Sequence, residues 1–221
     1  MTTLTAPTDS PDRAALSHKV QVGAAHYGRK YMTLPRVMSC WQQAKYVAQC
    51  GGKSVLEVGL GAGLTGWLLE KWGLDVVSLD LDAALSPSLA GDIIRLPIAD
   101  HAVDTVLAAE ILEHLPFEEF QPALRELARV ARGHVIITIP YRTIGLAIGL
   151  NLPFIEPLFT SFGLPYRTMN RFDGQHYWEM GRKGFSRRRV RKHIRAAGLH
   201  IVREFRPPLS LFAYGFVLRP A

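Results

Sequence analysis

The segment VLEVGLGAG, residues 55–63, constrains the fold of this chain more than any other. It has the pattern of a buried strand that runs directly into three glycines at alternate positions, Gly59, Gly61 and Gly63. A second apolar strand, VVSLD, ends on Asp80. A strand, a glycine turn that opens a helix and an acid at the tip of the next strand form the adenosine-binding half of a doubly wound α/β fold. The sequence therefore predicts an adenosine cofactor, with Asp80 accepting the ribose hydroxyls.

The position of the third glycine separates two classes of cofactor. The dinucleotide fingerprint G-x-G-x-x-G requires glycine at position 64, because a pyrophosphate lies over that helix start. Leu64 occupies this position, and the glycine falls at 63 instead. The spacing argues against NAD.

The same segment resembles the E/D-x-G-x-G-x-G signature of class I S-adenosylmethionine-dependent methyltransferases, with Glu57 in the acidic position. The resemblance continues in order through three further segments. These are GDIIRLP (91–97), similar to the adenine-contacting segment, AVDTVLAAEILEHLP (102–116), similar to the fourth strand and the helix start after it, and HVIITIP (134–140), similar to the fifth strand. The likeness covers residues 50–140 well and 176–218 more loosely. It implies a doubly wound, mostly parallel, seven-stranded Rossmann-like sheet.

The resemblance also implies the cofactor, S-adenosylmethionine, whose product is S-adenosylhomocysteine, and the residues that contact it. Glu57 would order the turn near the methionine ammonium group, Asp80 would hold the ribose and Asp92 the adenine amine. Asp82 is a second candidate for the ribose, although a solvent-facing loop acid is the preferred interpretation. The full predicted cofactor set is Glu57, Gly59, Gly61, Gly63, Asp80, Leu81, Asp92, Ile93, Ala109 and Glu110.

Length and composition predict one domain. A chain of 221 residues with 48% apolar residues supports one sizeable core. We expect residues 1–14 to be disordered and residues 15–221 to form the domain, with 15–50 as an N-terminal helical cover over the cofactor. Only eleven residues separate Asp80 from Asp92, too few for a crossover helix and a full strand. We therefore expect a shortened second crossover and a very short third strand near 88–91.

Apolar spacing predicts the remaining elements. Helices are expected over 36–50, 62–72, 118–132 and 184–197, and strands over 54–58, 75–79, 199–206 and 211–219. The expected buried stripes are Met38, Trp41, Ala44 and Ala48 in the first helix, Leu64, Trp67 and Leu68 in the second, and Phe120, Leu124, Leu127 and Val130 or Ala131 in the third.

Several negative features predict a cytoplasmic protein. The N-terminus lacks the basic and apolar pattern of a secretion signal, and the longest charge-free apolar candidate, residues 143–155, is only 13 residues long. The only cysteines, Cys40 and Cys50, are expected to be reduced. A cytoplasmic protein of this kind could also bind a membrane surface peripherally, and the sequence leaves this alternative open.

Two histidines are candidate bases, because histidine suits proton transfer near neutral pH. His114 follows Glu110 and Glu113 at helical spacing, at the sheet edge where ligands bind. His176 lies in DGQHYWEMG (173–181), which resembles a motif of bacterial methyltransferases. Tyr141, Tyr177 and Trp178 are candidate substrate contacts.

The same polar residues allow a metal as an alternative. Glu110, Glu113, His114 and His176 offer oxygen and nitrogen ligands for a divalent ion. A comparable E-x-x-E-H arrangement is found in some methyltransferases that act on catechol-like hydroxyls or RNA 3′ ends. Many relatives have the motif without needing a metal, so we expect no divalent ion.

Positive charge is concentrated in the C-terminal third. Residues 141–221 hold 14 Lys and Arg against 4 Asp and Glu, a balance of +10, while the whole chain has +7. Eight basic residues lie within 182–195. A solvated helix face, an anionic membrane surface, an acidic substrate and nucleic acid remain alternatives. We expect no nucleic acid, because the basic run has no aromatic residue for base stacking between Phe185 and Arg195.

The segment after the fifth strand, residues 141–181, is an apolar insertion. Its apolar residues are interrupted by prolines, so it must bury its surface against something other than a regular helix face. We expect a lid over the acceptor pocket first, a homodimer interface second and a shallow membrane contact third.

These observations predict a methyltransferase acting on an oxygen of a small-molecule acceptor. The acceptor classes are a sugar or glycan precursor and a phenolic or polyketide-type metabolite. Two alternatives remain. One is a non-catalytic S-adenosylmethionine-binding interaction module, and the other is an RNA methyltransferase.

Overall fold

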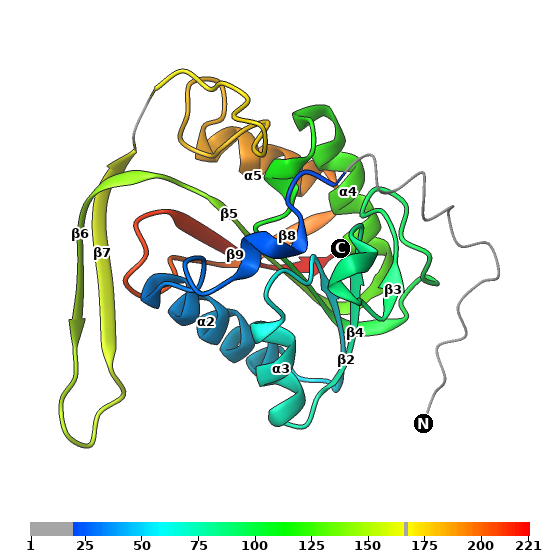
Figure 1. Cartoon of the computed structure of the whole chain (residues 1–221), viewed down its shortest axis with the longest axis horizontal. Helices are drawn as coiled ribbons and strands as arrows, with labels where there is room; N and C mark the ends of the chain where they lie inside the picture. Colours follow the sequence, from blue (N-terminus) through cyan, green and yellow to red (C-terminus); the bar gives the residue numbers. More distant parts are fainter. Residues whose placement is uncertain (1–19, 166–167) are drawn as a thin grey trace.

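A seven-stranded sheet forms the centre of the computed structural model, which describes residues 20–165 and 168–221. The predicted disordered segment 1–14 lies outside the described residues. The strand order is β3-β2-β1-β4-β5-β9-β8, and every pairing is parallel except those of β9, which runs antiparallel to both β5 and β8 (Figure 1). The strands are β1 (Ser54–Val58), β2 (Asp75–Asp80), β3 (Leu89–Ala90), β4 (Val103–Ala109), β5 (Ala131–Pro140), β8 (Leu199–Phe205) and β9 (Ala213–Pro220).

The central strand β1 shows why this sheet forms. Val55, Leu56 and Val58 are almost completely buried, as expected of a parallel strand covered on both faces. Val58 pairs with Leu79 of β2 and with Ala108 of β4. The three strands therefore end at the same edge of the sheet, and the residues that follow them meet there.

The second crossover is shortened, as predicted. A single 3₁₀ turn, η2 (Ala83–Leu85), follows β2, and the two-residue strand β3 follows that turn. Asp92 comes two residues after β3, so it returns to the edge at which β2 ends.

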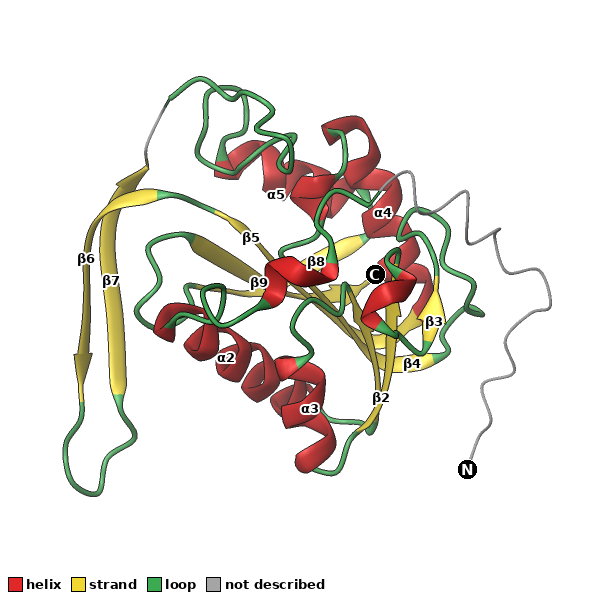
Figure 2. Ribbon diagram, in the orientation of Figure 1, coloured by secondary structure: helices red, strands yellow, loops and turns green. Residues whose placement is uncertain are grey.

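Helices cover both faces of the sheet (Figures 1 and 2). On one face lie α2 (Leu34–Cys50) and α3 (Leu64–Lys71), and on the other α4 (Phe117–Val130) and α5 (Arg187–Ala196). The predicted stripe of α4 is confirmed, because Phe120, Leu124, Leu127 and Val130 are fully buried. No helix among the described residues is long and apolar enough to span a bilayer.

The predicted stripe of α3 is wrong. Trp67 is 52% exposed, and the buried residues are Thr65, Gly66 and Leu69. Gly66 faces the carboxylate of Glu57 so closely that a side chain at this position would collide with it. This approach fixes which face of α3 meets the sheet.

The buried stripe of α2 also differs from the prediction. Gln43, Ala44 and Val47 are buried, while Ala48 is exposed. Gln43 Nε2 donates to Thr138 Oγ1 of β5 at 3.3 Å, and Thr65 Oγ1 of α3 donates to Gln43 Oε1 at 3.1 Å. A polar residue therefore occupies the interior face of α2, which hydrophobic spacing alone does not predict.

The insertion after β5 begins with a separate two-stranded sheet. Strands β6 (Thr143–Leu150) and β7 (Leu158–Pro165) pair antiparallel and form a hairpin that projects from one side of the molecule (Figure 1). Residues 168–186 then return to the domain as a loop.

Candidate functional site

A cavity of about 420 Å³ opens at the edge where β1, β2 and β4 end. This is the edge at which doubly wound folds bind their ligands. Eight of the ten predicted cofactor contacts line it, namely Gly59, Gly61, Asp80, Leu81, Asp92, Ile93, Ala109 and Glu110. Glu57 and Gly63 do not line it.

The glycine turn needs its glycines. Gly59, Gly61 and Gly63 have φ angles of 85°, 52° and 69°, in the region that favours glycine. A Cβ atom on Gly59 would also lie 2.9 Å from Cδ1 of Ile111. The turn therefore brings bare backbone to the cavity wall, which fits close approach by a ligand.

The Asp80 carboxylate is fixed at the tip of β2. Its Oδ2 accepts from Leu60 N at 2.8 Å, and its Oδ1 accepts from Asp82 N at 2.9 Å. Burial raises the pKa of Asp80, although these two hydrogen bonds oppose the shift. The backbone N–H of Gly61 also faces this carboxylate, and three N–H groups leave at least one of its about four acceptor positions for a ligand hydroxyl. Asp82 instead caps η2 through a bond from Ala84 N at 2.9 Å.

The N-terminal cover of the cavity differs from the predicted one. Residues from the segment before α2 line the cavity, and none from α2 does. They are Val20, Gln21, Val22, Tyr27 and Tyr31. Burial, reinforced by the neighbouring Tyr31, Asp80 and Asp82, raises the pKa of Tyr27 to about 12. The sequence offered no strong signal for this segment, because two tyrosines four residues apart are common in surface turns.

Glu57 lies behind the cavity wall, beneath α3. It is 5% exposed, and its Oε2 atom has no hydrogen-bond partner among the described residues. Burial raises the pKa of Glu57 to about 7, against the effect of the Gly66 backbone N–H. Its position fits a role in supporting the glycine turn.

This pKa shift predicts a pH-dependent cost to stability. The folded protein keeps the Glu57 proton up to about pH 7, whereas the unfolded chain loses it near the ordinary glutamate pKa of 4.5. Stability is therefore lost as the pH rises between these values, by roughly 3 kcal/mol at 1.36 kcal/mol per pKa unit. We expect the free energy of unfolding of Glu57→Gln, relative to that of the original protein, to increase by about this amount between pH 4.5 and pH 8. Urea unfolding without cofactor measures it. Glu118→Gln, an exposed change on α4, is the control, and parallel pH curves for Glu57→Gln and the original protein would contradict the shift.

Two acids follow β4, Glu110, which is half-buried at the first cavity, and Glu113. Glu110 has a left-handed backbone with φ of 52°, and burial raises its pKa to about 7. Glu113 lies in the 3₁₀ turn η3 (Leu112–His114) and is fully buried. Both of its carboxylate oxygens are without a hydrogen-bond partner among the described residues. Burial and the nearby Glu110 raise the pKa of Glu113 well above its ordinary value.

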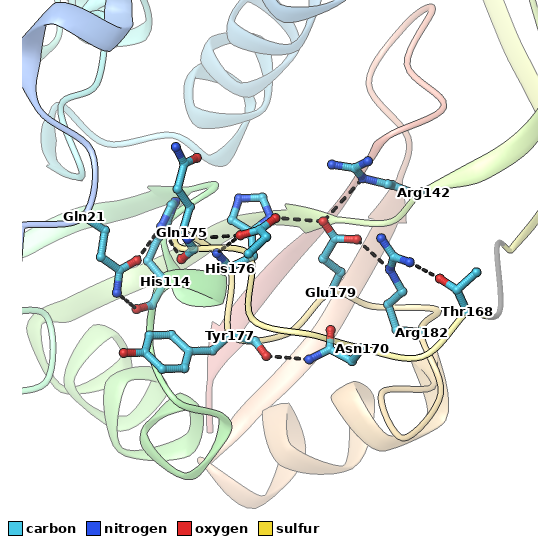
Figure 3. A network of polar contacts seen from close by, with 11 residues as sticks. Gln21, His114, Arg142, Thr168, Asn170, Gln175, His176, Tyr177, Glu179 and Arg182 are labelled. Carbon is cyan, nitrogen blue, oxygen red and sulfur yellow. Dashed lines mark hydrogen bonds and ion pairs between the residues drawn. The ribbon is translucent and has the colours of Figure 1, made fainter.

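The two predicted histidines lie together (Figure 3). Their ring centroids are 5.1 Å apart, at an angle of 80°. The Nδ1 atom of His114 lies 3.0 Å from the Gln175 carbonyl oxygen and 3.1 Å from Gln21 Oε1. Two oxygen acceptors at Nδ1 favour a proton there and leave Nε2 as the unprotonated nitrogen. Burial, with a contribution from His176, lowers the pKa of His114 to about 4, so this ring is neutral at pH 7.

Glu179 orients His176. Its Oε1 lies 3.0 Å from His176 Nδ1, and its Oε2 accepts from Arg182 Nε at 2.9 Å (Figure 3). Arg142 Nε is 3.3 Å from the same carboxylate. Burial alone would raise the pKa of Glu179, but the bonds from His176 and Arg182 and the arginine charges lower it. Our reading of the sequence missed Glu179, although the His-x-x-Glu spacing in HYWE is a signal for it.

A second cavity of about 410 Å³ lies on the side of His176 and Glu179. Its lining is polar, with Thr168, Met169, Asn170, Arg171, Asp173, His176, Glu179 and Arg182. His114 lines the first cavity and His176 the second. The two rings in contact therefore lie between the two cavities, one on each side.

The three candidate substrate contacts lie in different surroundings, and only one of them lines a cavity. Tyr177 lines the first cavity and is 37% exposed. Trp178 is fully buried against Phe117 and Phe120, so its role is core packing rather than substrate contact. Tyr141 is buried against Tyr214 and lines neither cavity.

The insertion only partly behaves as a lid. Phe172 and Tyr177, from its second half, line the first cavity, and residues 168–182 supply the lining of the second. The β6–β7 hairpin, residues 143–165, lines neither. The prediction of a lid over 141–181 is therefore wrong for its first half.

Within the described part of the chain, the side chains that are able to hold a metal ion overlap with the predicted set. Ligand atoms of Glu113, His114 and His176 lie within 4.8 Å of one another, as do those of Asp173, His176 and Glu179. Glu110 belongs to neither group, because it lies at the end of β4 and outside the turn that carries Glu113 and His114.

Known proteins share this architecture. Residues 56–139 match the family model described as a methyltransferase domain, and no curated protein matches the chain. Three solved structures are similar to it, and each TM-score is above 0.5. The 1,6-didemethyltoxoflavin-N1-methyltransferase of Burkholderia thailandensis, with bound 1,6-didemethyltoxoflavin and S-adenosylhomocysteine, has 18% identity and a TM-score of 0.63, covering 98% of this chain and 93% of that one.

The other two are more distant in structure. The magnesium protoporphyrin IX methyltransferase of Synechocystis PCC 6803, with bound S-adenosylmethionine, has 16% identity and a TM-score of 0.58, covering 97% and 100% of the two chains. A S-adenosylmethionine-dependent methyltransferase from Aquifex aeolicus has 18% identity and a TM-score of 0.59, covering 90% and 100%. The family match spans the glycine turn, Asp80, Asp92 and Glu110, which are the residues gathered at the first cavity. Residues 56–139 therefore match a methyltransferase domain, and the chain shares the fold of S-adenosylmethionine-dependent methyltransferases.

Proposed function

We propose that the protein methylates a hydroxyl oxygen of a small-molecule acceptor that enters from the second cavity. The observation that carries this proposal is His176, a histidine that a buried carboxylate orients in the second cavity and whose ring contacts His114 of the first. A hydroxyl must lose its proton when it is methylated, so an oxygen acceptor needs a base at this point.

The first cavity fits S-adenosylmethionine, which supplies an electrophilic methyl group when bound. Its bare glycine backbone, the lone pairs of Asp80 and the volume of about 420 Å³ suit an adenosine ligand with an amino acid tail. We assign ribose binding to Asp80, adenine binding to Asp92 and Ile93, and the methionine end to Gly59 and Glu110. Methyl transfer is an in-line displacement, so alignment of the acceptor is the main task of the protein.

His176 acts as the general base. Because Nδ1 faces Glu179, the ring keeps its proton on that nitrogen and offers Nε2 to the acceptor hydroxyl. Arg142 and Arg182 keep Glu179 ionised, so the carboxylate stabilises the charge that His176 gains with the proton. His114 has a lowered pKa and is the weaker base, and its contact with the His176 ring gives it a positioning role.

The acceptor is a small molecule in this proposal. Two of the similar structures are methyltransferases of small molecules, 1,6-didemethyltoxoflavin and magnesium protoporphyrin IX. Sugar or glycan precursors and phenolic or polyketide-type metabolites are the classes to test. Arg171 and Arg182 line the second cavity and suit an acceptor that carries an acidic group.

Two alternative functions remain distinguishable. RNA methylation receives less support, because several α5 cations contact the domain itself: Arg191 pairs with Glu204 at 2.7 Å, and Arg187 donates to Tyr214 at 3.1 Å. Steeply salt-dependent RNA binding would nevertheless favour it. The non-catalytic binding module would bind S-adenosylmethionine and release no product.

The test is release of S-adenosylhomocysteine over a panel of hydroxylated acceptors, with the methylated atom located by mass spectrometry. We expect turnover with an oxygen acceptor. Binding of S-adenosylmethionine without release for any acceptor in a broad panel would favour the module, and methylation only at nitrogen or carbon would contradict the proposed base chemistry.

Chelation is expected to leave turnover unchanged. His176 and Glu179 already provide a base with its carboxylate partner, and alignment requires no ion. Activity measured after extensive EDTA dialysis, with and without added Mg²⁺ or Mn²⁺, checks this expectation. Loss of turnover that Mg²⁺ restores would instead assign an ion to the cluster of Glu113, His114 and His176.

A further inference from the structure

One face of the β6–β7 hairpin is an exposed apolar surface. Cross-strand pairing places Ile144 opposite Leu164 and Leu146 opposite Phe162. Because successive side chains of a β-strand point to opposite faces, every second residue of each strand lies on this face. The outward face consists of Ile144, Leu146, Ile148, Leu150, Leu158, Phe162 and Leu164, each between 45% and 79% exposed, with Thr160 as its polar member.

The opposite face is turned toward the domain. Its side chains are smaller, and Ala147, Phe159 and Ser161 are half-buried. A Cβ atom placed on Gly149 would lie 3.7 Å from Leu209, which locates the loop before β9 beside this face. The hairpin is therefore asymmetric, and the larger apolar side chains are the uncovered ones.

The tip of the hairpin extends the apolar face. Leu152 and Ile155 are 44% and 55% exposed, and Phe154 is completely exposed. Isolated apolar side chains on a surface need no explanation, but a continuous set of this size marks a surface that another partner covers.

The charges around the hairpin favour an anionic partner. Glu156 is the one charged residue between 143 and 165, and its carboxylate lies 2.8 Å from Lys45 Nζ. Beside the root of the hairpin lie Arg142, whose side chain is 51% exposed, and Arg206, which donates to Thr143 Oγ1 at 3.2 Å.

Charge and composition favour an anionic bilayer over a second copy of the chain as the partner of this face. Two copies of a chain with a net charge of +7 repel each other, whereas an anionic bilayer attracts each one. Protein interfaces also carry about ten hydrogen bonds and a polar rim, for which this face provides almost no side chains.

We propose that the β6–β7 hairpin docks the protein on the surface of an anionic lipid bilayer, with Leu152, Phe154 and Ile155 entering the interfacial layer. The contact is shallow, because the outer edges of a two-stranded sheet carry backbone groups that lose hydrogen bonds in the hydrocarbon core. The net positive charge of the chain adds an attraction to anionic headgroups.

Vesicle flotation of the full chain tests this proposal without any acceptor or cofactor. We expect binding to phosphatidylcholine vesicles that contain phosphatidylglycerol, weaker binding to phosphatidylcholine alone, and a decrease with salt. The triple change Leu152→Ser, Phe154→Ser and Ile155→Ser should lower the partition coefficient by about 100-fold or more, because three apolar side chains no longer enter the interface. Trp67→Ser and Val202→Ser, at positions 52% and 59% exposed on other elements, are matched controls and should bind as the original protein does.

A fluorescent variant locates the contact. Phe154→Trp should show a blue-shifted emission on anionic vesicles and quenching by brominated lipids. Absence of vesicle binding overturns the proposal, and so does unchanged binding of the triple variant, which would assign the contact to another basic surface such as α5. If the protein does not bind vesicles, and light scattering shows a dimer that Leu146→Asp converts to monomers, the apolar face is an interface with a second copy.

Discussion

Replacing His176 with alanine is expected to lower turnover by ~10²–10⁴, the usual contribution of general acid–base catalysis. The ring lies between Glu179 and the His114 ring. Among the described residues, His176 is the only candidate base whose Nδ1 atom faces a carboxylate, and the change removes it. The affinity for S-adenosylmethionine should remain nearly constant, because His176 lines the second cavity and not the first. Single-turnover rates on the acceptor found in the panel and calorimetry with the cofactor measure the two effects.

Two further variants define the role of each partner. Glu179→Gln keeps a hydrogen-bonding group beside His176 but removes the charge, so turnover should fall less than in His176→Ala and its pH profile should shift. His114→Ala should be milder than His176→Ala. Near-original turnover of His176→Ala together with an inactive His114→Ala would reverse the two roles and leave the segment around His176 as a structural lid. Added imidazole should partly restore His176→Ala if the lost function is proton transfer.

The elements that the sequence predicted well are those specified by short-range patterns. β1 has the predicted bounds, Ser54–Val58, because the apolar residues Val55, Leu56 and Val58 lie between one glycine turn and the next. The short β3 followed from counting the residues between Asp80 and Asp92. The cofactor residues meet at one edge of the sheet because parallel strands all end at that edge.

The errors arise where a side chain's surroundings come from distant parts of the chain. Trp67 was expected to be buried, but the approach of Gly66 to Glu57 turns α3 so that Trp67 faces outward. Glu110, Glu113 and His114 have helical spacing, yet Glu110 ends a strand and Glu113 points into the core from a 3₁₀ turn. No local pattern carries this information.

The insertion shows the same limit on a larger scale. Its apolar composition correctly indicated that it must be covered, but composition does not specify by what. The hairpin turns its small side chains inward and its large ones outward, which is opposite to what a lid over the cavity requires. The lining of the second cavity comes from residues 168–182, whose polar sequence gave little sign of a pocket.

Replacing Asp80 with alanine is expected to weaken S-adenosylmethionine binding by ~2–4 kcal/mol, since two ribose hydroxyls lose a charged acceptor. This corresponds to a dissociation constant about 30- to 700-fold higher in calorimetry. The backbone N–H groups of Leu60 and Asp82 also lose their acceptor, so the unfolding temperature without cofactor must be measured alongside. Asp80→Asn serves as the matched variant, because it removes the charge and one of the two oxygen acceptors but keeps the other, and it should show an intermediate loss.

Asp82→Ala separates the two neighbouring acids. Backbone N–H groups of Leu60 and Asp82 fix the Asp80 carboxylate at the tip of β2, whereas Asp82 caps the turn η2, so the change at Asp82 should leave the cofactor affinity close to that of the original protein. Unchanged affinity in Asp80→Ala with a large loss in Asp82→Ala would transfer ribose binding to the second acid. Binding of NAD should be undetectable in every variant, because Leu64 occupies the glycine position over which a pyrophosphate would lie. Tight NAD binding would contradict the assignment of the first cavity altogether, since the glycine spacing and Asp80 would then serve a dinucleotide.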